Sequence, residues 1–242
     1  MQPADRQTQT SSQTGRQTGR QTGRQTGRQT GPQGQTRART RAAPGPAGFR
    51  KAIPPVLYLA GLAPAAWAFW LGARNQLGAD PVRTFEHILG LWAFRFLLAS
   101  LTVTPLRALS GINLVRYRRM LGLLAFAYAV MHVAAYIGLD LRFDFAILYR
   151  DLTKRPFLIF GMLALVTLLP LAATSNKVSI RALGRNWRRL HRLVYVALVA
   201  ACVHFLMAFK TWHMDALVYV GIGAMLLALR LAATLWRAAR RA

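Results

Sequence analysis

The stretch WRRLHRLVYVALVAACVHFLM, residues 187–207, decides the fold, because it is apolar enough to cross a lipid bilayer as a helix. It also carries two histidines, His191 and His204. An ionisable side chain inside a membrane span is costly and by default indicates a functional role. The stretch therefore predicts a membrane protein whose chemistry involves histidine.

The composition of the whole chain supports this class. Of the 242 residues, 54% are hydrophobic and only 16% are charged, which is typical of membrane proteins. The net charge of +25 comes from basic residues in an N-terminal tail and in gaps between apolar runs, a pattern that favours anionic lipid over nucleic acid as the partner. The single cysteine, Cys202, permits neither an internal disulfide nor a cysteine-based zinc site within this chain.

The first 49 residues form a separate region. Residues 13–28 are four copies of QTGR, and QTGP follows them. Such a polar, low-complexity segment buries too little apolar surface to offset the entropy of ordering, so we predict a disordered basic tail over residues 1–49 and a membrane domain over residues 50–242.

The membrane domain contains six apolar runs of nearly the length that a helix needs to cross the hydrocarbon core. Backbone polar groups must be satisfied internally in lipid, so each run is predicted to be a helix. The predicted fold is all-α, an integral membrane bundle of six transmembrane helices over Ile53–Gly72, His87–Leu106, Met120–Leu139, Phe157–Ala173, Leu190–Phe209 and Ala216–Trp236.

The charges between these runs predict the orientation. Two connections contain only basic charges: Arg107, Arg116, Arg118 and Arg119 in one, and Lys177, Arg181, Arg185, Arg188 and Arg189 in the other. The remaining connections contain Asp80, Glu86, Asp140, Asp144, Asp151 and Asp215. By the positive-inside rule the purely basic connections face the cytoplasm, so both termini are expected to be cytoplasmic.

His132 and His204 are the strongest candidate metal ligands. His132 lies 13 residues after Arg119 and His204 lies 14 residues after Leu190, so their heights in the membrane differ by about 1.5 Å. Small residues share the helix face of each histidine: Ala125, Ala129 and Ala135 for His132, and Ala197, Ala200, Ala201 and Ala208 for His204. Two imidazoles at one depth beside shallow troughs predict a b-type haem. The alternative is that small residues only let helices approach closely, with each imidazole bonded across them.

Three further residues are weaker candidates. His191 lies about 140° around a straight helix from His204, so it supports a second haem only weakly and otherwise suits a quinone, a flavin, a haem propionate or the interface. Arg95 lies deep in the second span and needs a buried partner, either a propionate or the carbonyls of another helix. His87, at the outer interface, suits either the headgroup level or a place beside the haem or a docking surface.

Motifs of other enzyme classes do not occur. The chain has no phosphate-binding glycine loop after a strand, no HExxH and no GxSxG, which argues against an NTPase or a hydrolase. It also has no soluble domain for NAD(P)H, so electrons must come from elsewhere.

Four segments resemble the MsrQ (YedZ) family, and more distantly the ferric-reductase-like transmembrane domains. They are GLWAFRFLLASLTVTPLR, RYRRMLGLLAFAYAVMHVAAY, KRPFLIFGMLALVTLLPLAATS and LGRNWRRLHRLVYVALVAACVHF, and the resemblance runs from about residue 53 to 236. It implies an electron-transfer subunit, rather than the catalytic subunit, in a bacterial inner membrane. Its partner would be the periplasmic molybdopterin enzyme MsrP, which reduces methionine sulfoxide in oxidised proteins.

The resemblance also implies cofactors and donors. The family is associated with haem b and FMN, and it takes electrons from the quinone pool or from a cytosolic flavin reductase. His132, His191 and His204 correspond to the family's histidines. FMN depends on the resemblance alone, because no FMN-binding motif is visible.

Two other functions compete with electron transfer. A proton or solute transporter would use the histidines and Arg95 to line a pathway, but the spans show neither an acidic relay nor an obvious internal repeat. A passive membrane anchor for a redox enzyme would not need the histidines.

Overall fold

The computed structural model describes residues 47–208 and 214–240, and within these ranges every regular element is helical. The elements are α1 (Ala47–Ala73), α2 (Pro81–Ser110), α3 (Val115–Ala135), the π-helical turn η1 (Tyr136–Asp140), α4 (Phe145–Lys154), α5 (Pro156–Ala173), α6 (Lys177–Leu183), α7 (Arg185–Leu190), α8 (Leu193–Ala208) and α9 (Met214–Ala239). Residues 1–46, which contain nearly all of the predicted disordered tail, lie outside the described ranges.

The predicted all-α class and the six spans are confirmed. Six helical segments are long and apolar enough to cross a membrane: Val56–Ala73, Pro81–Ser110, Val115–Asp140, Pro156–Ala173, Arg185–Ala208 and Met214–Ala239. The chain is therefore a multi-pass membrane protein. Most of these helices extend past the predicted runs, because helical hydrogen bonding continues where the side chains become polar. As a result Glu86, which we predicted in a connection, lies inside α2.

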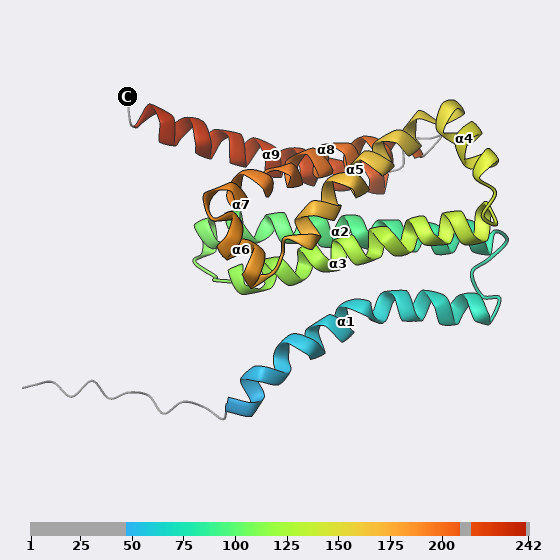
Figure 1. The fold of residues 1–242 in the computed structure, drawn as a ribbon, viewed down its shortest axis with the longest axis horizontal. Helices are drawn as coiled ribbons and strands as arrows, with labels where there is room; N and C mark the ends of the chain where they lie inside the picture. Colours follow the sequence, from blue (N-terminus) through green and yellow to red (C-terminus); the bar gives the residue numbers. More distant parts are fainter. Residues whose placement is uncertain (1–46, 209–213, 241–242) are drawn as a thin grey trace, which may run out of the picture. The chain divides into compact units, whose positions relative to one another are not determined.

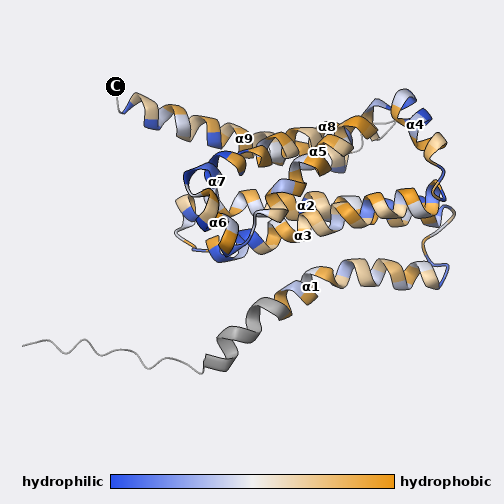
Figure 2. Cartoon of the chain, in the orientation of Figure 1, coloured by the Kyte–Doolittle hydropathy of each residue, from blue (hydrophilic) through white to orange (hydrophobic). Residues whose placement is uncertain are grey.

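Successive spans run in opposite directions through the bundle. The α2–α3 connection and the helices α6 and α7 lie at one end of the bundle, and α4 and the α1–α2 connection lie at the other (Figure 1). Hydrophilic residues gather on α7 and in parts of α4, whereas the spans between them are largely hydrophobic (Figure 2). The most extensive packing joins α2 to α3 and α5 to α8, so the bundle contains two closely packed helix pairs.

Capping residues explain where several helices begin and end. The Asp80 side chain accepts a hydrogen bond from the Arg83 N–H, and Pro81 occupies the first turn of α2, where its missing N–H costs nothing. At the other end of α2, Gly111 adopts a left-handed conformation with φ of 71°, which glycine tolerates best, and its N–H bonds to the Arg107 carbonyl.

Three short helices lie in connections that we did not predict to be helical. Asp144 caps α4 by accepting from the Ala146 and Ile147 N–H groups, and Asn176 caps α6 by accepting from the Ser179 N–H. An N-cap residue is a recognisable sequence signal for a helix start, but these helices are too short for an apolar-run search to find them.

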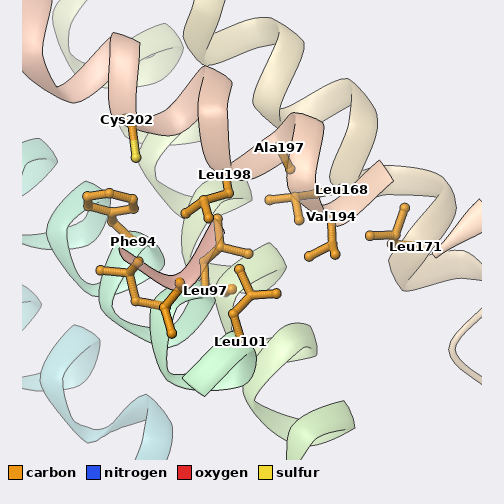
Figure 3. Packing of buried hydrophobic residues seen from close by; sticks show 12 residues of the cluster. Phe94, Leu97, Leu101, Leu168, Leu171, Val194, Ala197, Leu198 and Cys202 are labelled. Atoms are coloured by element: carbon orange, nitrogen blue, oxygen red, sulfur yellow. The ribbon is translucent and has the colours of Figure 1, made fainter. Parts of the chain in front are cut away.

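The main core joins α2, α3, α5, α8 and α9. Its buried residues are Phe94, Leu97, Leu98, Leu101, Ala125, Leu168, Leu171, Val194, Ala197, Leu198, Cys202 and Leu226, most of which are labelled in Figure 3. In α3 and α8 these residues precede His132 and His204, so the bundle on the α6–α7 side of the two histidines contains this hydrocarbon core. The level of His132 and His204 lies between this core and the α4 end.

A buried tyrosine attaches α1. The Tyr128 hydroxyl donates to the Gly61 carbonyl at 2.9 Å and accepts from the Ala65 N–H at 3.0 Å. In a regular α-helix the Ala65 N–H donates to the Gly61 carbonyl. The Tyr128 hydroxyl therefore bonds to both partners of one backbone hydrogen-bonding position in α1. Pro64 lies between them and cannot donate a backbone hydrogen bond.

Candidate functional site

The structure brings His132 and His204 together. Their ring centroids lie 6.3 Å apart, and the ring planes are inclined by 77°. His132 comes from α3 and His204 from α8, so each closely packed helix pair supplies one imidazole. His204 lies in the last third of the described part of α8, toward the α4 end of the bundle.

Each imidazole bonds to the backbone of the partner helix in its pair. His132 Nδ1 donates to the Glu86 carbonyl of α2 at 2.8 Å, and His204 Nδ1 donates to the Phe157 carbonyl of α5 at 2.7 Å. A carbonyl oxygen only accepts, so Nδ1 must carry the proton in both rings. In a neutral ring this leaves the lone pair of Nε2 for a metal ion, and such a bond also orients the ligand.

A glycine one helical turn after each carbonyl makes room for the ring. A Cβ atom on Gly90 would lie 3.1 Å from His132 Nδ1, and a Cβ atom on Gly161 would lie 2.7 Å from His204 Nδ1. We call each carbonyl with its glycine a bracket: Glu86 and Gly90 for His132, and Phe157 and Gly161 for His204. The brackets were missed by sequence reasoning, although both glycines interrupt apolar runs, 42 and 43 residues before their histidines.

The spacing of the two rings fits a single metal ion. An imidazole nitrogen lies about 2 Å from a bound metal ion, and the ring centroid lies about 1 Å further away, so two rings on opposite sides of one ion have centroids about 6 Å apart. The observed 6.3 Å agrees with this distance. Two neutral imidazoles form the donor set of a bis-histidine haem iron.

The alanines near the histidines are more tightly packed than predicted. Ala125 and Ala197 are fully buried in the main core, and Ala129 and Ala201 pack against it. The Nδ1 edges of the two rings instead meet the bracket glycines of the neighbouring helices. The close approach of the rings therefore depends on residues of α2 and α5 as well as on the small residues of α3 and α8.

His191 does not join this pair. Within the described residues no group of three or more His, Cys, Asp or Glu side chains could hold a metal ion. The His191 ring stacks on Trp187, with centroids 3.8 Å apart, and its Nδ1 bonds to the Trp187 carbonyl at 3.2 Å. Our assumption of a straight helix was wrong, because α7 ends at Leu190 and α8 begins at Leu193.

Arg95 has a partner that we did not predict. Its Nε donates to the Tyr219 hydroxyl of α9 at 2.8 Å, and its guanidinium lies over the rings of Trp92 and Tyr219. His87 is exposed, and its ring is nearly parallel to that of Phe205, with centroids 6.5 Å apart. Arg95 and His87 thus both contact aromatic rings.

A polar network lies next to the His204 bracket. The Tyr136 hydroxyl donates to Asp151 Oδ2 at 2.9 Å, and Arg155 Nη1 lies 3.3 Å from the same oxygen. Asp151 is buried at the end of α4, and Arg155 directly precedes α5. The network therefore connects the end of the third span to the turn that supplies the Phe157 carbonyl.

Comparison with known proteins identifies the family. Residues 89–202 match the family described as ferric reductase like transmembrane component. Proteins named protein-methionine-sulfoxide reductase heme-binding subunit MsrQ, from Brucella ovis, Brucella canis and Brucella suis, are each 54% identical over 185 residues, which cover 76% of this chain and 81% of the relative. No solved structure matches the chain. The chain belongs to the MsrQ family of heme-binding subunits of protein-methionine-sulfoxide reductase.

Proposed function

We propose that this chain binds one b-type haem between His132 and His204 and passes electrons through it across the bacterial inner membrane. The observation that carries the proposal is the pair of imidazoles from separate spans, with ring centroids 6.3 Å apart and both Nδ1 atoms bonded to backbone carbonyls. The haem, when bound, would supply one-electron chemistry, while the protein supplies ligands, burial and a docking surface.

The surrounding residues have distinct tasks in this proposal. The brackets hold the rings in the tautomer that presents Nε2. The main core keeps water out of the bundle on the α6–α7 side of the histidines. Because His204 lies near the α4 end, an electron at this level is close to a partner that docks there.

The direction of electron transfer, from the cytoplasmic side to the periplasmic side, follows from the proposed orientation. We infer that α6, α7 and both termini face the cytoplasm, since the connections at that end carry the unbalanced basic charges. Alkaline phosphatase is active only outside the cytoplasm, so fusions after Asp144 should be active and fusions after Ser110 inactive. The reverse pattern would overturn the orientation.

The proposed partner is a periplasmic molybdopterin enzyme of the MsrP type, which reduces methionine sulfoxide in oxidised proteins. The proposed donor is either the quinone pool or a cytosolic flavin reductase, and FMN is proposed from family membership alone. Adding a quinol, or NADH with a flavin reductase, to membranes that contain the protein separates the two donors by which one reduces the haem.

The reduced-minus-oxidised absorbance spectrum of the purified protein tests the function. Wild type should show a b-haem spectrum, which His132→Ala and His204→Ala should abolish while His87→Ala retains it. A colourless wild-type protein would favour the transporter or the passive anchor. Full haem content in both ligand variants would refute the ligand assignment.

A further inference from the structure

Each candidate ligand is held at two points by one turn of a neighbouring helix. Carbonyl and glycine are four residues apart in both brackets, which places them one above the other on one helix face. The same arrangement occurs in both helix pairs, although the bracket sequences EHILG and FLIFG share only two residues. The two contacts are a hydrogen bond at Nδ1 and the close approach of the glycine backbone to the edge of the ring.

We infer that Gly90 and Gly161 are positioning residues that set the strength of the Nδ1 hydrogen bonds and, through them, the reduction potential of the bound haem. This inference rests on the proposed haem ligation. It assigns to the two glycines a role in tuning the ligands rather than only in helix packing.

A methyl group at Gly161 cannot be absorbed by an easy side-chain movement, whereas at Gly90 the ring would have to yield by only a few tenths of an ångström. At Gly161 the new Cβ would lie 2.7 Å from His204 Nδ1 and 2.9 Å from Cε1, closer than real Cβ contacts. The ring is tethered at Nδ1 by the Phe157 carbonyl, and haem iron would hold it at Nε2. The displacement must therefore lengthen one of these two bonds, and either change would weaken the donation of the imidazole to the iron.

The sign of the effect on the potential follows from the hydrogen bond. An Nδ1–H bond to a carbonyl makes the imidazole a stronger donor to the metal, which favours the oxidised, more positively charged iron. A methyl group that lengthens this bond weakens that preference. The midpoint potential should rise in Gly161→Ala, and it should rise less in Gly90→Ala, where the Cβ would lie 3.1 Å from Nδ1.

Two other glycines provide matched controls. A Cβ on Gly122, in the same helix as His132, would meet nothing within 4 Å. A Cβ on Gly223 would lie 2.9 Å from the Sγ atom of Cys202, in the same helix as His204. Gly223→Ala thus crowds α8 nearly as closely as Gly161→Ala, but without touching an imidazole.

The test is a redox titration of the purified full-length variants, with the electron paramagnetic resonance spectrum of the oxidised haem as second readout. We expect a higher potential, an altered low-spin signal and about tenfold weaker haem binding in Gly161→Ala, in the range for disturbed outer-shell partners. We expect smaller changes of the same sign in Gly90→Ala, and wild-type values in Gly122→Ala.

Three outcomes would overturn the inference. The first is a wild-type potential and a wild-type signal in Gly161→Ala. The second is a shift of the potential in Gly223→Ala as large as the shift in Gly161→Ala. The third applies if Gly161→Ala does not accumulate in the membrane, and it is a wild-type potential in Gly90→Ala. Each presupposes that wild type binds haem. A wild-type protein without haem would instead refute the proposed function.

Discussion

Asp151 offers a quantitative test of how the α4 end of the bundle is held. The side chain of Asp151 is only 12% exposed, and it contacts both the Tyr136 hydroxyl and the Arg155 guanidinium. Replacing Asp151 by alanine removes both contacts and leaves the hydroxyl without its acceptor. Because Arg155 directly precedes α5, we also expect looser placement of the Phe157 carbonyl that holds His204.

The two contacts differ in their expected energies. A hydrogen bond to a charged group contributes about 1.5–3 kcal/mol to stability. The ion pair contributes at most about 1 kcal/mol, because the Arg155 side chain is 50% exposed and solvent screens it. Asp151→Ala should therefore destabilise the protein by about 2–4 kcal/mol. Asp151→Asn, which keeps a neutral acceptor for Tyr136, should cost about half as much.

Thermal unfolding in detergent measures these differences. For a chain of this size about 1 kcal/mol corresponds to about 2–4 °C, so Asp151→Ala should lower Tm by roughly 5–15 °C. A double-mutant cycle with Tyr136→Phe should give a coupling energy of about 1.5–3 kcal/mol. The exposed Asp140 provides the control. If Asp151→Ala lowers Tm no more than Asp140→Ala does, the network does not stabilise this end.

Tyr128→Phe should destabilise the protein by about 1–2 kcal/mol, since two interhelical hydrogen bonds to α1 are lost, and a Tm unchanged from wild type would contradict this. Tyr219→Phe should leave the Arg95 Nε without its hydroxyl partner and lower Tm by a few degrees, whereas Arg95→Lys should be no milder because lysine lacks the planar fork. His191→Ala should retain the full absorbance of the haem between His132 and His204, because the pair lies apart from His191. Loss of half the haem would instead show that His191 holds a second one.

The spans could be predicted from sequence because lipid restricts the backbone so strongly. Each of the six apolar runs lies in a helical segment long enough to cross a membrane, and the fifth of these segments comprises α7 and α8. Most errors occurred at the ends, where helical bonding continues into polar sequence. The helices α4, α6 and α7 were missed for the opposite reason. They are short, lie in connections and contain charged residues, so no membrane-length apolar window marks them.

The candidate site was likewise predictable only in part. Counting residues from the ends of two spans puts His132 and His204 at one depth, and the structure brings their rings together. The partners of these rings and of Arg95 could not be predicted, because they depend on which helices are neighbours. Residue spacing reports on one helix at a time, and contacts such as Arg95 to Tyr219 join residues 124 positions apart.

The two helix pairs differ in how the chain between the bracket glycine and its histidine is divided between helix and connection. Gly90 precedes His132 by 42 residues and Gly161 precedes His204 by 43. In the first pair the long helices α2 and α3 account for nearly all of this length, with a connection of only residues 111–114. In the second pair α5 and α8 are shorter, and residues 174–192, with α6 and α7, make up the difference. Because a ligand pair requires equal depth and not equal helix lengths, the second connection is free to differ. The break at His191 lies in this longer connection, between the end of α7 and the start of α8.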